Sequence, residues 1–462
     1  GAPGMSHDFD LVVRNATLAL AGGAALGDLA VAEGRIAAIT GPGALAGSAR
    51  EELDGTGLHL LPGGVDPHVH LDEPGRTEWE GLASGTRALA AGGFTSYVDM
   101  PLNNIPLTLD GPSFDAKLAA AEASSLLDFA FWGGLVPGNL GSLGELHARG
   151  VAGFKAFTCF SGIEDFGAAD DLTLWEGMQR IAELDSILLV HAENAAMVAG
   201  LTARARAAGL TGVMDAVRAR PAISELEAIN RVLFLAGETG CRVHVVHVST
   251  ARGVRMVAEA RAAGLDVSCE TCPHFLLFTE EDVAEIGVSL KSAPPPRTAD
   301  DREGLWAALA DGTLPMVTSD HSPGPPELKV GDNFFALWGG ISGCQHTLQL
   351  LLAEGLARRG LPLETIVSAA STAAARRFGL AGKGELAVGA DADLALLDLS
   401  QEWTLREEEL LYRHRFSAYI GQRLRGRVQR TVVRGTTVFD GTSFPGRPAG
   451  RLLRPSAPRS NP

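Results

Sequence analysis

Residues 242–263 read RVHVVHVSTARGVRMVAEARAA, an apolar β-branched run followed directly by a stretch with helical periodicity. β-Branched residues favour strands, and apolar residues three and four apart favour an amphipathic helix. The same order recurs between about residues 57 and 380, with strands expected at 58–65, 94–100, 129–136, 151–157, 187–191, 242–248, 265–270 and 314–320. Intervening helices are expected at 78–91, 171–184, 224–236, 250–263 and 365–378. Eight such units predict an α/β fold of the (β/α)8 TIM-like barrel type.

A doubly wound open sheet would also alternate strands and helices. It would normally carry a Gly-rich phosphate turn after an early strand, and no G-x-G-x-x-G follows one here. The alternation therefore favours the barrel.

The two ends of the chain differ from this middle part. Short alternating strands are expected at both ends, and LVVRNATLAL (11–20) resembles TVVRGTTVFD (431–440). Isolated hairpins are marginally stable, so we expect the two ends to join in one small domain. The predicted division is a β-sandwich from residues 5–56 and 384–445, a barrel from 57–383, and a Pro/Arg/Ser-rich tail from 446–462.

Composition limits the classes of function. The 462 residues are 46% hydrophobic and carry a formal net charge of -16, which predicts a globular protein and disfavours nucleic acid as a partner. Five cysteines are too few and too odd in number for a disulfide framework, so we expect a reducing, cytoplasmic location. The longest uncharged stretch contains glutamines and a histidine, which disfavours a membrane span.

Polar residues that can bind metal ions follow the predicted strands at their carboxyl ends, where barrel enzymes place their sites. They are His68 and His70 after the first strand, Lys155 in the fourth, His191 ending the fifth, His247 in the sixth and Asp320 after the eighth. His68 and His70 share one face of an extended segment. Each residue alone is ambiguous, but six of them converge on one mouth of the barrel.

Lys155 and the two histidines of the sixth strand need particular interpretations. Only five of the 39 basic residues are lysines, and burial of Lys155 would favour its neutral amine. It is interpreted either as an ion-paired or snorkelling lysine, or as one that reacts with carbon dioxide to give a metal-bridging carbamate. His244 and His247 face opposite ways in a strand, so we expect His247 to be the ligand and His244 to be a packing histidine. Cys269 and Cys272 have redox-like spacing, but they lie on a barrel strand and are expected to be core thiols.

Nitrogen and oxygen ligands without thiolate favour zinc, with manganese, cobalt or nickel as alternatives. Two such divalent ions bridged by a carbamate could polarise a carbonyl and supply hydroxide. The six residues therefore predict a binuclear metal hydrolase.

The chain resembles the cyclic amidohydrolases over nearly its whole length. The similar stretches are HVHLDEPGRTEWEG (68–81), DMPLNN (99–104), ETCPH (270–274), SDHSP (319–323), WGGISG (338–343), YRHR (412–415) and YIG (419–421). The resemblance implies that His68, His70 and Asp320 hold one ion, that His191 and His247 hold the other, and that carbamylated Lys155 bridges them. It also implies attack of a metal-bridging hydroxide on a ring amide while Asp320 takes the proton and returns it to the leaving nitrogen.

Within the family, the stretches are most similar to those of members that open the hydantoin ring of allantoin in purine breakdown. That likeness suggests Asn103, Ser292 and Ser322 as substrate contacts, although Ser292 stands where a cysteine is expected and Phe275 where tyrosine is common. Dihydroorotases usually carry an arginine two residues after the second histidine to bind a carboxylate, and here that residue is Asp72. Hydantoinase, dihydropyrimidinase and dihydroorotase activities remain alternatives, as does a non-catalytic dihydropyrimidinase-like scaffold. The resemblance suggests a homotetramer or a homodimer.

Overall fold

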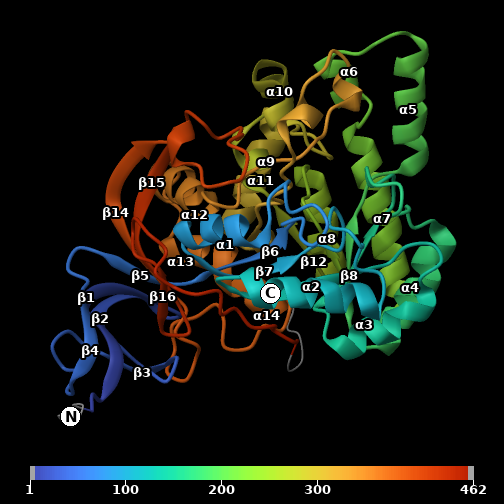
Figure 1. Ribbon diagram of the computed structural model, residues 1–462. Coiled ribbons are helices and arrows are strands. Elements are labelled where there is room, and N and C mark those ends of the chain that lie inside the picture. The colour runs from blue at the N-terminus through green and yellow to red at the C-terminus, as the bar shows by residue number, and fades with distance from the viewer. Residues whose placement is uncertain (1–5, 456–462) are drawn as a thin grey trace.

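The computed structural model describes residues 6–455, and its centre is a parallel sheet of eight strands (Figure 1). The strands follow one another in chain order, and a parallel bridge between Val69 and His321 joins the last strand to the first. They are β6 (Gly64–Val69), β7 (Phe94–Asp99), β8 (Asp128–Gly134), β9 (Gly153–Phe157), β10 (Ile187–His191), β11 (Arg242–Val245), β12 (Val267–Thr271) and β13 (Met316–Val317). The predicted (β/α)8 architecture is confirmed.

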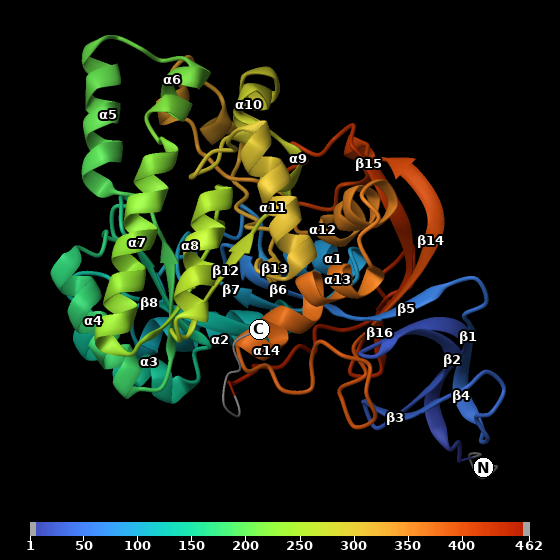
Figure 2. The same ribbon diagram turned by 180° about the vertical axis from the view of Figure 1, so that it is seen from behind.

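Helices cover the outer face of the barrel strands (Figure 2), and the inner face is buried in the barrel interior, so both faces are shielded from water as parallel sheets require. The covering helices are α1 (Leu82–Ala91), α2 (Gly111–Ser124), α3 (Leu143–Arg149), α4 (Asp171–Glu183), α7 (Ala222–Thr239), α8 (Ala251–Ala262) and α11 (Ala299–Asp311). The helix predicted at 365–378 is divided into α13 (Leu363–Val367), a π-helical turn (Ser368–Thr372) and α14 (Ala373–Arg377). No described helix is both long and apolar enough to cross a membrane.

Four further helices lie at the end of the barrel that carries the carboxyl ends of its strands, namely α5 (Ala195–Ala207), α6 (Val213–Arg218), α9 (Pro273–Leu277) and α10 (Glu280–Ile286). The helix α12 (Thr347–Leu351) lies beside α1 and packs against β15. The pair α5 and α6 forms an arm that projects beyond the body of the molecule, at the upper right of Figure 1. Neither α5 nor α6 is among the helices predicted from the sequence.

Strands from both ends of the chain form one further mixed sheet, as predicted, in the order β16-β15-β14-β5-β1-β2-β3 with β4 beside β1. These strands are β1 (Phe9–Leu20), β2 (Gly23–Ala32), β3 (Arg35–Thr40), β4 (Ala49–Asp54), β5 (His59–Pro62), β14 (Leu394–Thr404), β15 (Arg423–Val433) and β16 (Thr436–Phe439). The single strand predicted at 58–65 is therefore divided between the two sheets. A Cβ at Gly63 would lie 2.1 Å from Thr95 Oγ1, so only glycine permits this crossing. We propose Gly63 as the junction between the two parts.

At the opposite end of the barrel, the segment of residues 450–453 packs beside β8, and Asp128 at the start of β8 forms ion pairs with Lys383 and Arg434. The backbone amides of Gly450 and Phe129 donate to the carbonyls of Ser125 and Arg451, so residues 450–453 run beside the start of β8. Part of the predicted tail thus packs on its own chain, and its last seven residues lie outside the described range.

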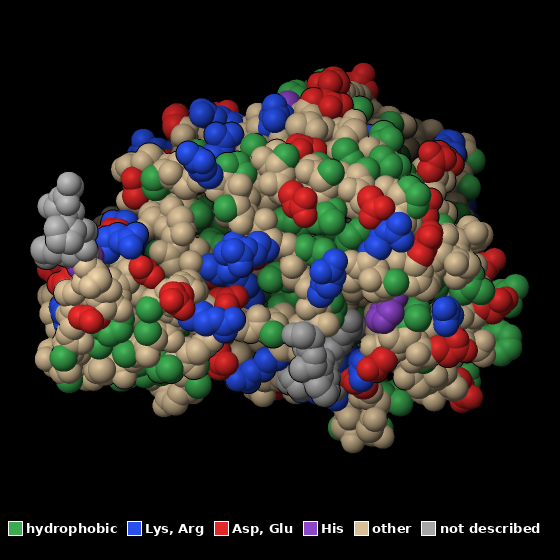
Figure 3. Space-filling view, turned by 60° about the horizontal axis from the view of Figure 1, so that its bottom comes forward, with side chains coloured by type: hydrophobic (Ala, Val, Ile, Leu, Met, Phe, Trp, Pro, Cys, Tyr) green, Lys and Arg blue, Asp and Glu red, His purple; other side chains and the backbone are tan. Residues whose placement is uncertain are grey.

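On the face seen in Figure 3, basic and acidic side chains are interspersed.

Candidate metal centre

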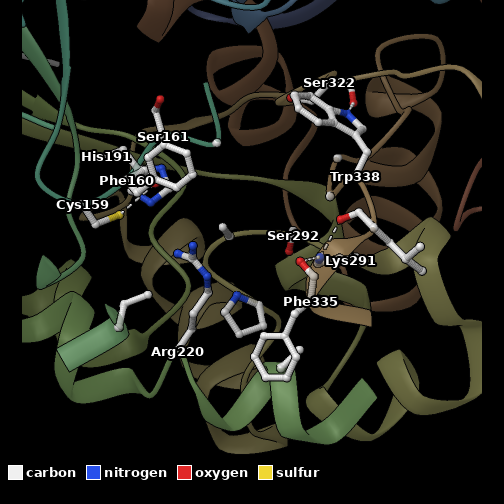
Figure 4. Close-up of a pocket in the computed structure, with 18 of the residues that line it drawn as sticks. Cys159, Phe160, Ser161, His191, Arg220, Lys291, Ser292, Ser322, Phe335 and Trp338 are labelled. Atoms are coloured by element: carbon white, nitrogen blue, oxygen red, sulfur yellow. Dashed lines mark hydrogen bonds between the residues drawn. The ribbon is translucent and has the colours of Figure 1, made fainter. Parts of the chain in front are cut away.

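One cavity of about 770 Å³ opens at the carboxyl ends of the barrel strands. Figure 4 shows its wall, with His191 on one side and Ser322 and Trp338 on the other. The side chains that line it include all nine residues that the sequence analysis selected, namely His68, His70, Asn103, Lys155, His191, His247, Ser292, Asp320 and Ser322. Their individual roles stay predictions, but the structure brings them together.

A first group of donor atoms comes from the end of β6 and the segment after β13. Nε2 of His68 lies 3.0 Å from Oδ1 of Asp320, and Nε2 of His70 lies 3.6 Å from the same oxygen. One ligand atom from each of the three residues lies within 4.8 Å of the others. This spacing is short enough for a single ion to contact all three.

A second pair of donor atoms comes from β10 and the segment after β11. Nδ1 of His191 lies 3.0 Å from Nε2 of His247. The ring centroids of His68 and His247 are 5.6 Å apart, so the two groups are neighbours. The geometry can therefore accommodate two adjacent ions.

The backbone is strained where it presents three of these residues. His247, Asp320 and Asn103 have φ angles of 37°, 46° and 76°, in the left-handed region that non-glycine residues rarely adopt. Such strain persists only where surrounding contacts fix it, and it concentrates at functional sites. Around Asp320 the fixing contacts include donation from the Ser319 amide to Oδ1 of Asp66 at 3.3 Å.

Hydrogen bonds on the far side of the rings fix the direction of their lone pairs. Nδ1 of His68 lies 2.7 Å from Oε2 of Glu270, and Nε2 of His191 lies 2.6 Å from Oε1 of Glu193. Neutral tautomers that donate to these carboxylates place lone pairs on the opposite nitrogens, which face Asp320 and His247. Lone pairs of His68 and His191 that point into the same space as the Asp320 carboxylate can coordinate a cation there. The donor set therefore fits divalent metal ions.

The pKa values of the histidines agree with this arrangement. Burial lowers the pKa of His70 and of His191, and it lowers that of His247 well below its ordinary value, so these rings are neutral and able to bind a metal ion. Burial acts in the same direction on His68, but the charges of Asp320 and Glu270 outweigh it and raise its pKa to about 9. A metal ion beside these carboxylates would take the place of that proton.

Asp320 itself is an ionised carboxylate. Burial would raise its pKa, but the charge and hydrogen bond of His68 hold that pKa well below its ordinary value. The Ser322 hydroxyl also donates to Oδ1 of Asp320 at 3.1 Å. Asp320 can therefore act both as a ligand and as a proton acceptor.

Lys155 is almost completely buried, with 1% of its surface exposed. Its Nζ lies 3.6 Å from Sδ of Met100 and 4.7 Å from the centroid of the Phe157 ring. Among the described residues it has no carboxylate within ion-pair distance, so it is not the ion-paired lysine of the alternative interpretation. Burial lowers its pKa to about 8, which raises the fraction of the neutral amine, the form that attacks carbon dioxide.

The three predicted substrate contacts lie at different parts of the cavity wall. Asn103 follows β7, Ser322 follows Asp320, and the Ser292 hydroxyl donates to the carbonyl of Pro294 at 2.7 Å. Asp72, by contrast, does not line the cavity. It is 1% exposed, and burial raises its pKa well above its ordinary value. Its absence from the lining means that Asp72 gives no direct information on the substrate.

Sequence reasoning missed the partners that hold the ligands. His244 is satisfied, as expected, but it does more than pack: its Nε2 lies 2.8 Å from Oε1 of Glu270, which also holds His68. Glu193 holds His191 and pairs with Arg220 at 2.6 Å. The available signal was an acidic residue at the end of an apolar strand, where an unpaired charge would be costly.

Comparisons with known proteins agree with this geometry. Residues 59–438 match the family model described as "Amidohydrolase family". The chain belongs to the amidohydrolase family. It is 56% identical over 447 residues to an allantoinase of Rubrobacter xylanophilus, covering 97% of this chain and 98% of that protein. It is 48% identical over 447 residues to an allantoinase of Deinococcus radiodurans, covering 97% and 99%.

Similar solved structures include a hydantoinase and a dihydropyrimidinase. The L-hydantoinase (dihydropyrimidinase) of Arthrobacter aurescens superposes with a TM-score of 0.93 at 33% identity, covering 96% of this chain and all of that one. The dihydropyrimidinase of Brevibacillus agri gives 0.89 at 31% identity, covering 97% and 98%. The predicted family and fold are confirmed.

Proposed function

We propose that this amidohydrolase is a metal-dependent allantoinase, which hydrolyses the hydantoin ring of allantoin to allantoate. The observation that carries the proposal is the convergence of six potential ligands on one cavity, in a chain 56% identical to an allantoinase. A non-catalytic scaffold would be expected to have lost some of these ligands, whereas all six are present.

We assign one ion to His68, His70 and Asp320, the other to His191 and His247, and a bridging carbamate to Lys155. Divalent ions bound there, zinc by preference, would polarise the ring carbonyl and lower the pKa of an attacking water to about 7. Glu270 and Glu193 hold the ligand rings in the tautomers that such ions require.

Asp320 carries the proton in this mechanism. Its ionised carboxylate accepts a proton from the attacking water, whose oxygen bonds to the ring carbonyl carbon. When the ring carbon–nitrogen bond breaks, Asp320 returns the proton to the leaving nitrogen. The Ser322 hydroxyl orients the carboxylate, and Asn103 and Ser292 are positioned to contact the ring.

The proposal is tested by metal content and ring hydrolysis on one preparation supplied with bicarbonate and a divalent metal. We expect two ions per chain and a preference for allantoin over dihydroorotate and 5-substituted hydantoins. Asp320→Ala should abolish hydrolysis, whereas Asp300→Asn, at an exposed aspartate, should leave it unchanged. A fully active Asp320→Ala protein would exclude the proton path.

A hydantoinase or dihydropyrimidinase activity is the second candidate, because the TM-score of 0.93 is to an L-hydantoinase. A preference for 5-substituted hydantoins in the same assay would favour it and leave the assigned site unchanged. We also expect a homotetramer or homodimer, which light scattering would measure.

A further inference from the structure

A loop of residues 323–341 forms much of the outer wall of the cavity. It leaves the barrel directly after Asp320 and returns where Ile341 forms a parallel bridge with His321. The Ser322 amide donates to the Ile341 carbonyl at 2.8 Å, so both ends of the loop lie beside the candidate metal centre. Several residues between these ends, including Phe335 and Trp338, line the cavity (Figure 4).

One lysine ammonium holds the middle of this 323–341 loop. Nζ of Lys291 donates to the carbonyls of Phe334 at 2.7 Å, Phe335 at 3.3 Å and Leu337 at 2.6 Å. The Lys291 carbonyl also accepts from the Gly340 amide at 2.9 Å. Lys291 directly precedes Ser292, so it connects the loop to a proposed substrate contact.

A second lysine holds the same loop from within. Nζ of Lys329 lies 3.5 Å from the Trp338 carbonyl and 3.4 Å from the Gly340 carbonyl. Only 6% of the Lys329 surface is exposed. The Trp338 amide donates to the carbonyl of Leu328 at 2.8 Å, so the outgoing and returning halves of the loop are hydrogen-bonded to each other beside the Lys329 ammonium.

The partners of these two lysines are unusual. Within residues 6–455, neither Lys291 nor Lys329 has a carboxylate within 4.0 Å, whereas Lys117 and Lys383 are both ion-paired. An ammonium whose hydrogen bonds go to backbone carbonyls fixes a backbone conformation, because each carbonyl must turn toward it. If the Lys291 ammonium were removed, the carbonyl oxygens of Phe335 and Leu337 would point toward the same position and lose this hydrogen-bond donor.

We propose that Lys291 and Lys329 are positioning residues that hold the 323–341 loop as the wall of the substrate cavity. Substrate binding depends on them more than the chemical step does. The predicted effect on substrate binding rests on the proposed hydrolysis of a cyclic amide. The predicted effect on the conformation of the loop does not. Loss of either ammonium opens the loop without disturbing the six candidate ligands.

The chain provides a selective probe of loop opening. A protease that cuts only after lysine has five possible sites, and four of those lysines are at most 6% exposed while Lys291 is half-buried. Val330, which follows Lys329, is 77% exposed. An opened loop should therefore be cut after Lys329, while the other buried lysines stay protected.

The first experiment compares the metal-loaded wild-type protein with Lys291→Met, which keeps a similar side-chain length but removes the donors. We expect cleavage after Lys329 to be at least about tenfold faster in the variant, with Lys117, Lys155 and Lys383 uncut. Equal resistance of the two proteins would overturn the proposal. Parallel cutting at all remaining lysines would also overturn it, since that result indicates global unfolding.

The second experiment is kinetic. In Lys291→Met we expect KM for the preferred ring to rise about tenfold while kcat changes less than about threefold. Lys291→Arg should restore most of the wild-type KM, and Lys329→Met should have a smaller effect because its contacts are longer. Arg252→Met, at an exposed cation, is the control for loss of positive charge and should leave KM unchanged.

An unchanged KM in Lys291→Met would overturn the proposal even if the loop were cut. If the wild-type protein hydrolyses no ring, the proposed function fails, and the protease result alone decides whether the two lysines hold the loop.

Discussion

Two buried lysines occupy opposite ends of the barrel in opposite surroundings. Lys383, beside the start of β8, has its Nζ 2.7 Å from Asp128, 3.1 Å from Asp391 and 2.8 Å from Asp393. Lys155, in β9 at the cavity, has its Nζ beside the sulfur of Met100 and the ring of Phe157. The lysine at one end of the barrel thus has three carboxylate partners, whereas the lysine at the other end has none among the described residues.

The pKa values of the two lysines diverge accordingly. Burial alone lowers both, but the charges of Asp393 and Asp128 reverse its effect and raise the pKa of Lys383 above its ordinary value. The pKa of Lys155 is lowered to about 8. In barrels, the end with the amino termini of the strands stabilises the fold and the other end carries chemistry. The comparison supports the proposal that Lys383 stabilises the fold and that Lys155 takes part in the chemistry.

The largest effect is expected when Lys155 is removed. Lys155→Ala should lose bound metal and lower kcat by roughly a thousandfold or more, because the proposed bridge between the ions could not form. Added short carboxylic acids should restore part of the activity, since they can supply the missing oxygens. Metal content and turnover, with and without such acids, check this.

The stability of Lys155→Met sharpens the comparison. Because the lysine has no carboxylate partner among the described residues, replacing it with an apolar side chain of similar length should leave the free energy of unfolding of the metal-free protein unchanged or higher. A strongly destabilised Lys155→Met, or full metal occupancy of Lys155→Ala without added acid, would contradict the assignment.

The opposite result is expected at Lys383. Lys383→Met leaves three carboxylates without their shared cation and should lower the free energy of unfolding by about 3–5 kcal/mol. Where the protein still folds, its kcat should match that of the wild type. Denaturant unfolding measures the first quantity and ring hydrolysis the second.

Arg423→Met is the matched control for Lys383→Met. Arg423 forms an exposed ion pair with Glu402, and such pairs contribute about 0–1 kcal/mol. A Lys383→Met protein no less stable than Arg423→Met would show that the buried cluster does not hold the two sheets together.

The lysine at the cavity was predictable from the sequence, and the one at the far end was not. Lys155 lies within a short apolar strand, a local pattern that indicates burial, and His68, His191 and Asp320 are likewise marked by the strands that they end. Lys383 lies in a polar turn, and its partner Asp128 is 255 residues away. Contacts at that separation depend on how the two sheets meet, which no local pattern describes.

The same limit explains the other differences. The strand predicted at 58–65 was a single apolar run, and its division at Gly63 follows from contact with Thr95. The sequence of α5 has weak amphipathic patterning, and only a few side chains of α5 and α6 are buried, so little in the sequence marked the arm. Glu270 was visible as part of a motif, but its bonds to both His68 and His244 required three strands to be placed together.

The smallest expected effect concerns acid and separates two carboxylates of the Lys383 cluster. Burial would raise the pKa of Asp128, but Lys383 and Arg434 outweigh it and lower that pKa below 3.8. A lowered pKa gives stability that is present above the unfolded value and lost as pH falls below it. Asp128→Asn should therefore be less stable at pH 7 yet lose less stability than the wild type between pH 5 and about pH 3.

Asp393 should show the opposite acid dependence. Burial raises its pKa, and Asp128 adds to that effect, so its folded form binds a proton more readily than its unfolded form. Such a group adds stability as pH falls, and Asp393→Asn should make the acid loss steeper than in the wild type. Urea midpoints at several pH values measure both slopes. If the stability of the two variants changed equally with pH, Lys383 would interact equally with Asp128 and Asp393. That result would contradict the opposite pKa shifts of these two carboxylates in the folded protein.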